Sequence, residues 1–288
     1  MPTATVNGVH LSYRIEGEGP PIVLAHGFST GHYVWDATAS RLAERFQVVR
    51  HDHRGHCDSS KPPGPYRIQD FVDDLAALLN YLGLERVDLV GHSMGGRTAL
   101  LFALNHPDRL NRLLLVGASG AAPEGAPGER FEALKKLAIE EGMAAVFDSD
   151  LFSFALPEAW KKNPASARER FLKNTPEGFC AAADAVLTMP DLRGRLGEID
   201  APVWACTGET DAGPMAFNEL LEERIASCTR AVISNCGHYP MLDAAEEFLA
   251  GLEGFLESAP GGESAPGGES APGGESAPGG GSSPGGEN

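Results

Sequence analysis

Short runs rich in apolar residues alternate with amphipathic stretches along most of this 288-residue chain. Runs of strand length, bounded by polar and turn-forming residues, occur at residues 21–25, 46–50, 86–90, 110–116, 202–207 and 229–234. Apolar positions at helical spacing predict a helix with Phe71, Leu75, Leu78, Leu79 and Leu82 on one face. Further helices are expected over residues 95–105 and in a last stretch that ends near Leu256.

Asn7 and Gly8 separate two short runs at the start of the chain, which is the signature of a two-residue hairpin turn. The first two strands are therefore expected to be antiparallel. The later strands alternate with helices, which predicts a mostly parallel sheet of eight strands covered by helices on both faces. The fold class is α/β.

The alternation stops between residues 121 and 200, where three helical segments are expected at 129–146, 157–173 and 176–188 with no strand between them. We interpret residues 121–200 as a helical cap inserted into a core formed by residues 1–120 and 201–257. The cap is rich in aromatic residues, some of which are expected to hold it together and others to face a substrate cavity.

Residues 258–288 contain a repeated Glu-Ser-Ala-Pro-Gly-Gly unit and almost no apolar side chains. Such a segment cannot offset its ordering entropy, so we expect a disordered acidic tail.

The formal net charge is −17, of which the four glutamates of the tail account for only a small part. An acidic body argues against nucleic acid or an anionic membrane as a partner. The five cysteines are odd in number and irregularly spaced, as expected for reduced thiols in a cytoplasmic protein. No signal peptide and no run long enough to span a bilayer is visible.

Residues 91–95 read Gly-His-Ser-Met-Gly and lie between a predicted strand and a predicted helix. G-x-S-x-G in this position is the pattern of a nucleophile elbow, in which a sharp turn exposes the serine hydroxyl. Side chains at Gly91 or Gly95 would collide with that turn. Ser93 is the candidate nucleophile.

A serine nucleophile needs a base and a group that orients the base. His238 lies in a loop between the last strand and the last helix, and we select it as the base. His10, His32 and His106 are expected at the surface. Asp211 follows the preceding strand and is selected as the acid, although Glu209 is nearer to that strand and could take the role.

An oxyanion hole needs two backbone N–H donors. The residue after the nucleophile, Met94, supplies one, and Phe28 in the loop after the strand at 21–25 is expected to supply the other. His26 is expected to anchor this loop through side-chain hydrogen bonds. Ser29 is a further candidate helper.

Residues 51–57 hold three histidines, an aspartate and a cysteine, which are potential zinc ligands. We favour a structural explanation, in which Asp52 and Arg54 tie this loop together.

These motifs resemble those of the α/β-hydrolase superfamily, and they run through residues 1–257. The matching segments are HGF at 26–28, DHRGH at 52–56, GHSMGG at 91–96, GETD at 208–211 and GH at 237–238. Cap segments at 175–179, 181–185 and 191–193 are similar to those of the 3-oxoadipate enol-lactonase group. Cys57 follows Arg54-Gly55-His56, at a position where the superfamily usually has glycine.

The resemblance implies an esterase or lactonase that acts on a small molecule through an acyl-enzyme, without a cofactor or metal. Two alternatives remain. The same residues could hydrolyse a carbon–carbon bond or carry out cofactor-free perhydrolysis, although carbon–carbon hydrolases of this fold often have Asn where this chain has His92. The chain could also be a receptor that keeps the fold and binds a ligand without turnover.

Overall fold

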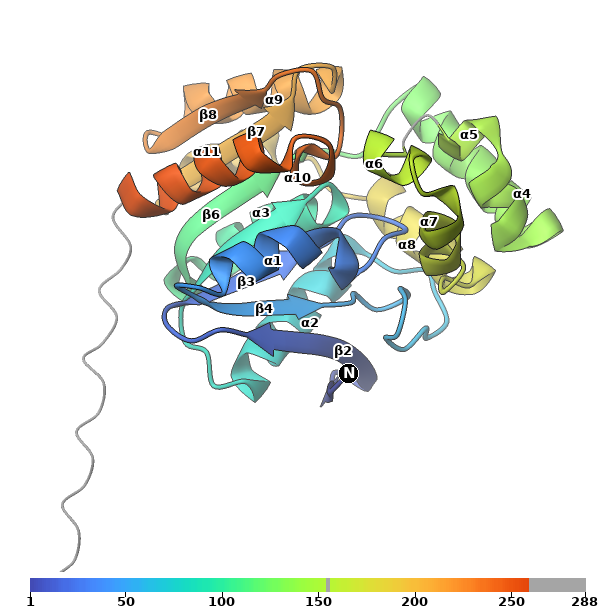
Figure 1. Cartoon of the computed structure of the whole chain (residues 1–288), viewed down its shortest axis with the longest axis horizontal. Coiled ribbons are helices and arrows are strands. Elements are labelled where there is room, and N and C mark those ends of the chain that lie inside the picture. Colours follow the sequence, from blue (N-terminus) through green and yellow to red (C-terminus); the bar gives the residue numbers. More distant parts are fainter. Residues whose placement is uncertain (154–155, 259–288) are drawn as a thin grey trace, which may run out of the picture.

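The computed structural model describes residues 1–153 and 156–258 (Figure 1). Strands β1 (Thr3–Val6) and β2 (Val9–Glu16) form the expected antiparallel hairpin, in which Val6 pairs with Val9. The two turn residues, Asn7 and Gly8, have φ of 48° and 76°. Two consecutive positive φ angles match the twist of the flanking strands, and Asn-Gly tolerates them better than most pairs.

The eight strands form one sheet in the order β1-β2-β4-β3-β5-β6-β7-β8. β2 pairs with β4 antiparallel, and all later pairings are parallel. The parallel strands are β3 (Pro21–Ala25), β4 (Gln47–His51), β5 (Val87–His92), β6 (Leu110–Val116), β7 (Val203–Gly208) and β8 (Cys228–Ile233). The predicted α/β class is confirmed. The strands at 21–25 and 110–116 have the predicted ends, and the ends of the others differ by one or two residues.

Helices cover both faces of the sheet (Figure 1). On one face, α1 (Asp36–Leu42) and α11 (Ala245–Ser258) pack through a cluster that includes Trp35, Trp204 and Phe248. On the other face lie α2 (Ile68–Tyr81), α3 (Met94–Asn105) and α9 (Ala212–Arg224). Short 3₁₀ turns occur at η1 (His32–Trp35), η2 (Pro107–Arg109) and η3 (Arg193–Glu198).

Between β6 and β7 the chain forms a group of helices beyond one end of the sheet (Figure 1). They are α4 (Ala126–Asp148), α5 (Asp150–Ser153), α6 (Glu158–Lys161), α7 (Pro164–Phe171) and α8 (Pro176–Leu187). We call this group the cap. An aromatic cluster of Phe147, Phe152, Phe171 and Phe179 lies inside it, whereas Trp160 packs against Tyr33 and Tyr239 of the core.

The single helix predicted over residues 157–173 is wrong, because the chain forms α6 and α7 there. Asn163 has non-helical φ and ψ of −136° and 67°, and its side chain accepts a hydrogen bond from the Ser166 N–H. Pro164 follows as the first residue of α7. Proline inside a continuous helix would clash with the preceding turn and remove a hydrogen bond, whereas it is well suited to the first helical position.

The predicted acidic tail falls almost entirely on residues 259–288, outside the described residues. Ser258, which was expected to begin it, is the last residue of α11. In the part of the chain that is described, no helix is both long and apolar enough to cross a membrane.

The strand order fixes where a site can form. From β3 the chain runs outward to β4 and then returns to β5 on the other side of β3. The loops that follow β3 and β5 therefore diverge, which opens a crevice at the carboxyl ends of these two parallel strands. Ser93 follows β5 directly, and the loop that contains Phe28 follows β3.

Candidate active site

Ser93 occupies a strained turn between β5 and α3, with φ of 52° and ψ of −111°. The glycines on either side leave room for this turn. A Cβ added to Gly91 would lie 2.4 Å from the Gly95 carbonyl oxygen, and one added to Gly95 would lie 2.4 Å from the Ala25 carbonyl oxygen. These contacts are shorter than van der Waals packing allows, so the turn excludes larger residues at both positions. The geometry is that of a nucleophile elbow.

Ser93, His238 and Asp211 meet although they come from three separate loops. Ser93 Oγ lies 2.9 Å from His238 Nε2, and His238 Nδ1 lies 2.7 Å from Asp211 Oδ2. Because a carboxylate only accepts hydrogen bonds, Nδ1 carries the proton and Nε2 presents its lone pair to the Ser93 hydroxyl. This arrangement can remove the hydroxyl proton during attack on a carbonyl.

The carboxylate of Glu209, the alternative orienting acid, faces another group. Its Oε2 accepts a hydrogen bond from the Asn235 N–H at 3.0 Å. Glu209 therefore braces the loop that follows β8, whereas Asp211 contacts the imidazole directly. The structure brings Asp211 to His238 and does not bring Glu209 there.

A second contact fixes the His238 loop. The His92 Nε2–H donates a hydrogen bond to the His238 carbonyl oxygen at 2.8 Å, and the two rings lie 4.9 Å apart. His92 is fully buried, and burial lowers its pKa well below the usual value, so the ring is neutral. The residue before the nucleophile thus braces the backbone of the candidate base.

Phe28 and Met94, the two expected oxyanion donors, both lie near Ser93, the first in the loop after β3 and the second as the next residue in the chain. A Cβ added to Gly27 would lie 3.1 Å from Ser93 Cβ, so the loop after β3 runs directly beside the nucleophile. Within the described ranges no hydrogen bond uses the N–H of Phe28 or of Met94. Since Met94 begins α3, its N–H has no acceptor in the helix and also lies at the positive end of the helix dipole.

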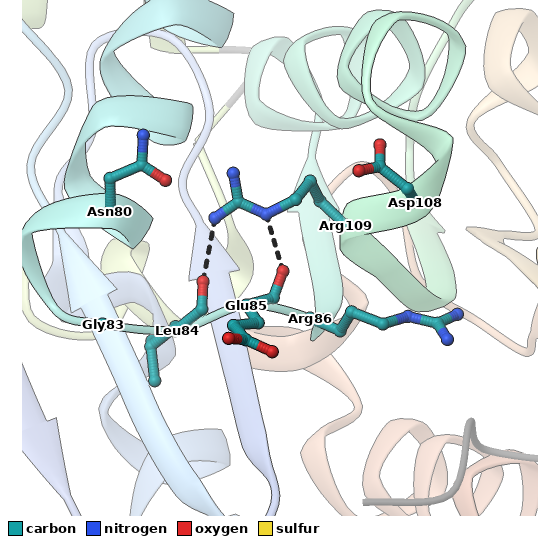
Figure 2. A pocket seen from close by; sticks show the side chains of 7 residues that line it. All are labelled: Asn80, Gly83, Leu84, Glu85, Arg86, Asp108 and Arg109. Carbon is teal, nitrogen blue, oxygen red and sulfur yellow. Dashed lines mark hydrogen bonds between the residues drawn. The ribbon is translucent and has the colours of Figure 1, made fainter. Parts of the chain in front are cut away.

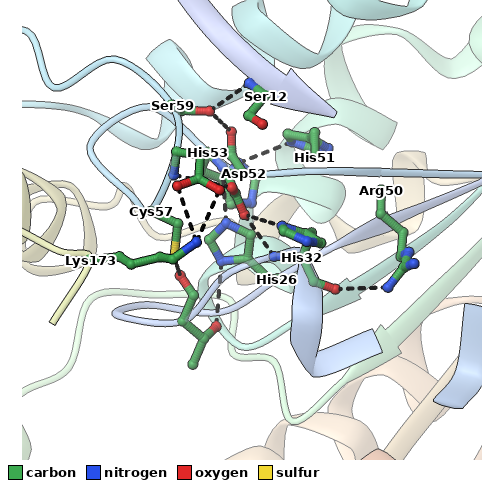
Figure 3. Close-up of polar contacts among 12 residues, drawn as sticks. Ser12, His26, His32, Arg50, His51, Asp52, His53, Cys57, Ser59 and Lys173 are labelled. Carbon is green, nitrogen blue, oxygen red and sulfur yellow. Dashed lines mark hydrogen bonds and ion pairs between the residues drawn. The ribbon is translucent and has the colours of Figure 1, made fainter. Parts of the chain in front are cut away.

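His26 anchors this loop, as expected from the sequence. Its Nδ1–H donates to the Gly27 carbonyl oxygen at 2.7 Å, and its Nε2 accepts from the His53 N–H at 2.9 Å. Ser29, the further candidate, is buried, and its N–H donates to His56 Nε2 at 3.2 Å. The loop after β3 is therefore held by the imidazoles of His26 and His56, and Figure 3 shows His26 beside His53.

The prediction that His32 lies at the surface is wrong. His32 is buried, and both its backbone N–H and its Nδ1 contact Asp52 Oδ1, at 2.8 and 2.9 Å. Asp52 is itself fully buried and holds the start of the loop (Figure 3). The partner of His32 lies 20 residues away in sequence, so local polarity gave no sign of its burial.

The histidine-rich segment has a structural role, as favoured above. Arg54 donates two hydrogen bonds of 2.6 Å to Asp74 in α2, one from Nε and one from Nη2. His56 donates from Nδ1 to the Arg54 carbonyl oxygen. Over residues 1–153 and 156–258, no group of three or more His, Cys, Asp or Glu side chains is arranged to hold a metal.

These histidines make folding sensitive to acid. Burial lowers the pKa of His51 and His56 to about 4, and burial with neighbouring histidines lowers the pKa of His26 and His53 well below the usual value. In the unfolded chain all four titrate near pH 6.5. Below that pH the unfolded state binds more protons, so stability is lost as the pH falls from about 6.5 toward 4.

We therefore expect the free energy of unfolding, measured by urea denaturation, to fall on the order of 5 kcal/mol between pH 7 and pH 5. Asp88 opposes this trend, because burial raises its pKa to about 6, but it contributes one proton against those of the four histidines and of His92, which is also buried and neutral. An unfolding free energy unchanged to within about 1 kcal/mol over this range would contradict the assignment of four neutral buried histidines.

Ser93, His238 and Asp211 open into a cavity of about 950 Å³ between the core and the cap. Phe28 and Met94 line it beside Ser93, and Phe131 and Leu134 of α4 line it from the cap. A second pocket, of about 540 Å³, lies elsewhere, beside α2 and η2 (Figure 2). There Arg109 donates to the carbonyl oxygens of Leu84 and Glu85, and the lining contains no serine, threonine, cysteine or histidine.

Asp243 connects the core to the cap beside this cavity. It ends the short helix α10 (Pro240–Asp243), and its Oδ1 accepts a hydrogen bond from the Ala159 N–H of α6 at 3.0 Å.

Cys57 has φ of 42°, a conformation that explains why glycine is usual at its position. Its N–H donates to Asn174 Oδ1 of the cap at 3.3 Å.

Fold and site geometry together define a protein of the hydrolase type, and comparison with known proteins supports this. The model of a family described as the alpha/beta hydrolase fold matches residues 20–175. The chain belongs to this family, and the resemblance inferred from its motifs is confirmed.

Three similar proteins cover most of the chain. A Caulobacter segnis protein, RutD, provisionally named a carbamate hydrolase, is 31% identical over 272 residues, covering 90% of this chain and 100% of its own. The 3-oxoadipate enol-lactonase 2 of Acinetobacter baylyi is 25% identical over 261 residues, covering 88% and 96%. The crystal structure of the enol-lactonase from Burkholderia xenovorans superposes with a TM-score of 0.82 at 30% identity, covering 89% and 100%.

Other relatives are longer. Uncharacterized proteins of Mycobacterium tuberculosis and Mycobacterium bovis are 39% identical over 120 residues, and this match spans 35% of their length.

Proposed function

We propose that the protein is a serine hydrolase that cleaves a carboxylic ester or lactone of a small molecule through an acyl-enzyme. The observation that carries this proposal is the alignment of Ser93 Oγ, His238 and Asp211 at 2.9 and 2.7 Å. Two unused N–H groups beside the nucleophile supply the remaining element that acyl transfer requires.

The mechanism follows from these positions. Ser93 Oγ attacks the substrate carbonyl while its proton passes to His238 Nε2, and the N–H groups of Phe28 and Met94 stabilise the oxyanion. His238 then returns the proton to the leaving oxygen, which forms the acyl-enzyme. A water molecule then attacks the carbonyl of this acyl-enzyme while His238 accepts a proton from the water. The bond between the acyl group and Ser93 Oγ breaks, and His238 passes the proton to that oxygen. Asp211 holds the imidazole orientation and favours the imidazolium.

The cavity supports a small substrate, because about 950 Å³ is the size expected for a drug-sized ligand. Two of the similar proteins are enol-lactonases by name, which supports a lactone as one substrate class. RutD adds carbamates, whose hydrolysis would use the same residues. His92 does not favour carbon–carbon hydrolysis, for which asparagine is usual at this position.

A panel of esters, lactones and carbamates of graded size tests the proposal. We expect sustained turnover of a p-nitrophenyl ester or a lactone by the wild-type protein, at many equivalents of product per protein. A single slow turnover followed by retained ligand would instead favour the receptor alternative. Turnover of carbon–carbon substrates alone would overturn the ester and lactone assignment.

A further inference from the structure

Arg97 lies in the cavity wall, one helical turn beyond the nucleophile. Its N–H donates to the Ser93 carbonyl oxygen at 3.0 Å, which fixes its position in α3 relative to the elbow. Its side chain lines the cavity together with Ser93 and His238.

The Arg97 guanidinium is held by neutral groups. Nη1 donates to the Ala121 carbonyl oxygen at 2.8 Å and contacts Met189 Sδ at 3.6 Å. Among the described residues, no carboxylate lies within ion-pair distance of it. The other N–H groups of the Arg97 guanidinium have no protein acceptor in the described chain.

The three carboxylates that line the cavity are each engaged elsewhere. Asp211 contacts His238, Asp243 accepts from the Ala159 N–H, and Glu158 pairs with Lys161 at 2.6 Å. Arg193, another cation in the lining, pairs with Asp191 at 2.6 Å. No described acidic side chain is therefore left in the lining to neutralise Arg97.

A partly buried arginine without a counter-ion is unusual, because removing a charge from water is costly unless it is paired. Burial lowers the pKa of Arg97 to about 10, which still leaves the group charged at neutral pH. The surrounding wall is largely apolar, with Val186, Phe131 and Phe217. A carboxylate of a bound molecule would accept from the planar guanidinium and neutralise it.

We propose that Arg97 is a carboxylate subsite, so that the preferred substrates are esters or lactones that carry a second, ionised carboxylate a short chain away from the reacting carbonyl. This inference rests on the proposed hydrolase function and names the substrate class of the same cavity. Because the body of the protein is acidic, a local cation would also be needed to attract such an anion.

Two esters of matched chain length test the subsite. The p-nitrophenyl half-ester of glutarate carries a terminal carboxylate, and p-nitrophenyl pentanoate carries a methyl group in its place. In Arg97→Gln we expect kcat/KM for the half-ester, relative to pentanoate, to fall about 10–100-fold, the range for losing a charge-assisted hydrogen bond. Arg97→Lys keeps the positive charge but not the planar guanidinium, so the relative kcat/KM for the half-ester should fall by a smaller factor.

Arg195→Gln is the matched control, because it removes one positive charge from an exposed ion pair with Glu198, outside the cavity lining. We expect its ratio of the two kcat/KM values to equal that of the wild type. An Arg97→Gln ratio that also stays at the wild-type value would overturn the proposal. Melting temperatures of all variants show whether a change reflects folding.

Binding of free glutarate separates this inference from the proposed function. If neither ester is hydrolysed, the hydrolase proposal fails, but glutarate should still raise the melting temperature of the wild-type protein and of Ser93→Ala. The same glutarate concentration should leave Arg97→Gln unchanged. Equal shifts in the wild type and Arg97→Gln, or no shift in the wild type, would contradict the subsite.

Discussion

Ser93→Ala is expected to lower kcat for ester hydrolysis by about 10⁴-fold or more, to near the background rate. The hydroxyl is the atom that forms the acyl-enzyme, and neither His238 nor the two N–H groups can replace it. The residual rate should come from the oxyanion donors and from substrate binding alone. Steady-state hydrolysis of p-nitrophenyl butyrate by the two proteins measures the effect.

The folded structure should tolerate this substitution. Alanine has a Cβ like serine, so the strain of φ 52° is already present in the wild type. We expect an unchanged circular dichroism spectrum and a melting temperature within a few degrees of the wild type. A variant that folds normally and keeps more than a few per cent of the activity would contradict the nucleophile assignment.

Asp211→Asn is expected to reduce kcat by about 10²–10⁴-fold, which corresponds to about 3–5 kcal/mol of transition-state stabilisation. The asparagine side chain can donate to Nδ1 and thereby hold the imidazole in the wrong tautomer, with its proton toward Ser93. KM should change much less, because Asp211 contacts the imidazole and is not needed to bind a neutral ester. Initial rates over a range of ester concentrations separate kcat from KM.

Glu209→Gln is the matched control, because this acid also follows β7 but faces the Asn235 N–H. Its oxygen can still accept that hydrogen bond, so kcat should stay within a few-fold of the wild type. If Glu209→Gln produced the large loss and Asp211→Asn did not, Glu209 would be the orienting acid.

The residues that the structure brings together beside Ser93 could be selected from the sequence because local rules determine their positions. A strand, a G-x-S-x-G turn and a helix identify Ser93, since the steric limits of that turn are visible in the glycines themselves. The carboxyl ends of parallel strands meet at one edge of a sheet, which is why Asp211 and His238 could be selected from their positions after strands.

Other features depend on contacts between distant segments. The burial of His32 follows from Asp52, and the role of Asp243 follows from its contact with the Ala159 N–H in the cap. The position of Arg97 is partly predictable, because it lies four residues after Ser93 on a predicted helix and therefore one turn away from it. Its lack of a carboxylate partner becomes visible only when the cap helices and α9 are in place. The break between α6 and α7, in contrast, has a local cause in Asn163 and Pro164.

The most direct test of a serine acyl-enzyme mechanism is to identify the residue that becomes acylated. Wild-type protein and Ser93→Ala would each be mixed with excess p-nitrophenyl butyrate, quenched in acid within the first turnover and analysed by peptide mass spectrometry. His238→Ala, exposed for longer to a reactive fluorophosphonate, would serve as a second sample. The account predicts a butyryl group on Ser93 in the wild type, none in Ser93→Ala, and much slower phosphonylation of Ser93 in His238→Ala. Acylation of a different residue, or turnover by the wild type with equal labelling of Ser93→Ala, would contradict it.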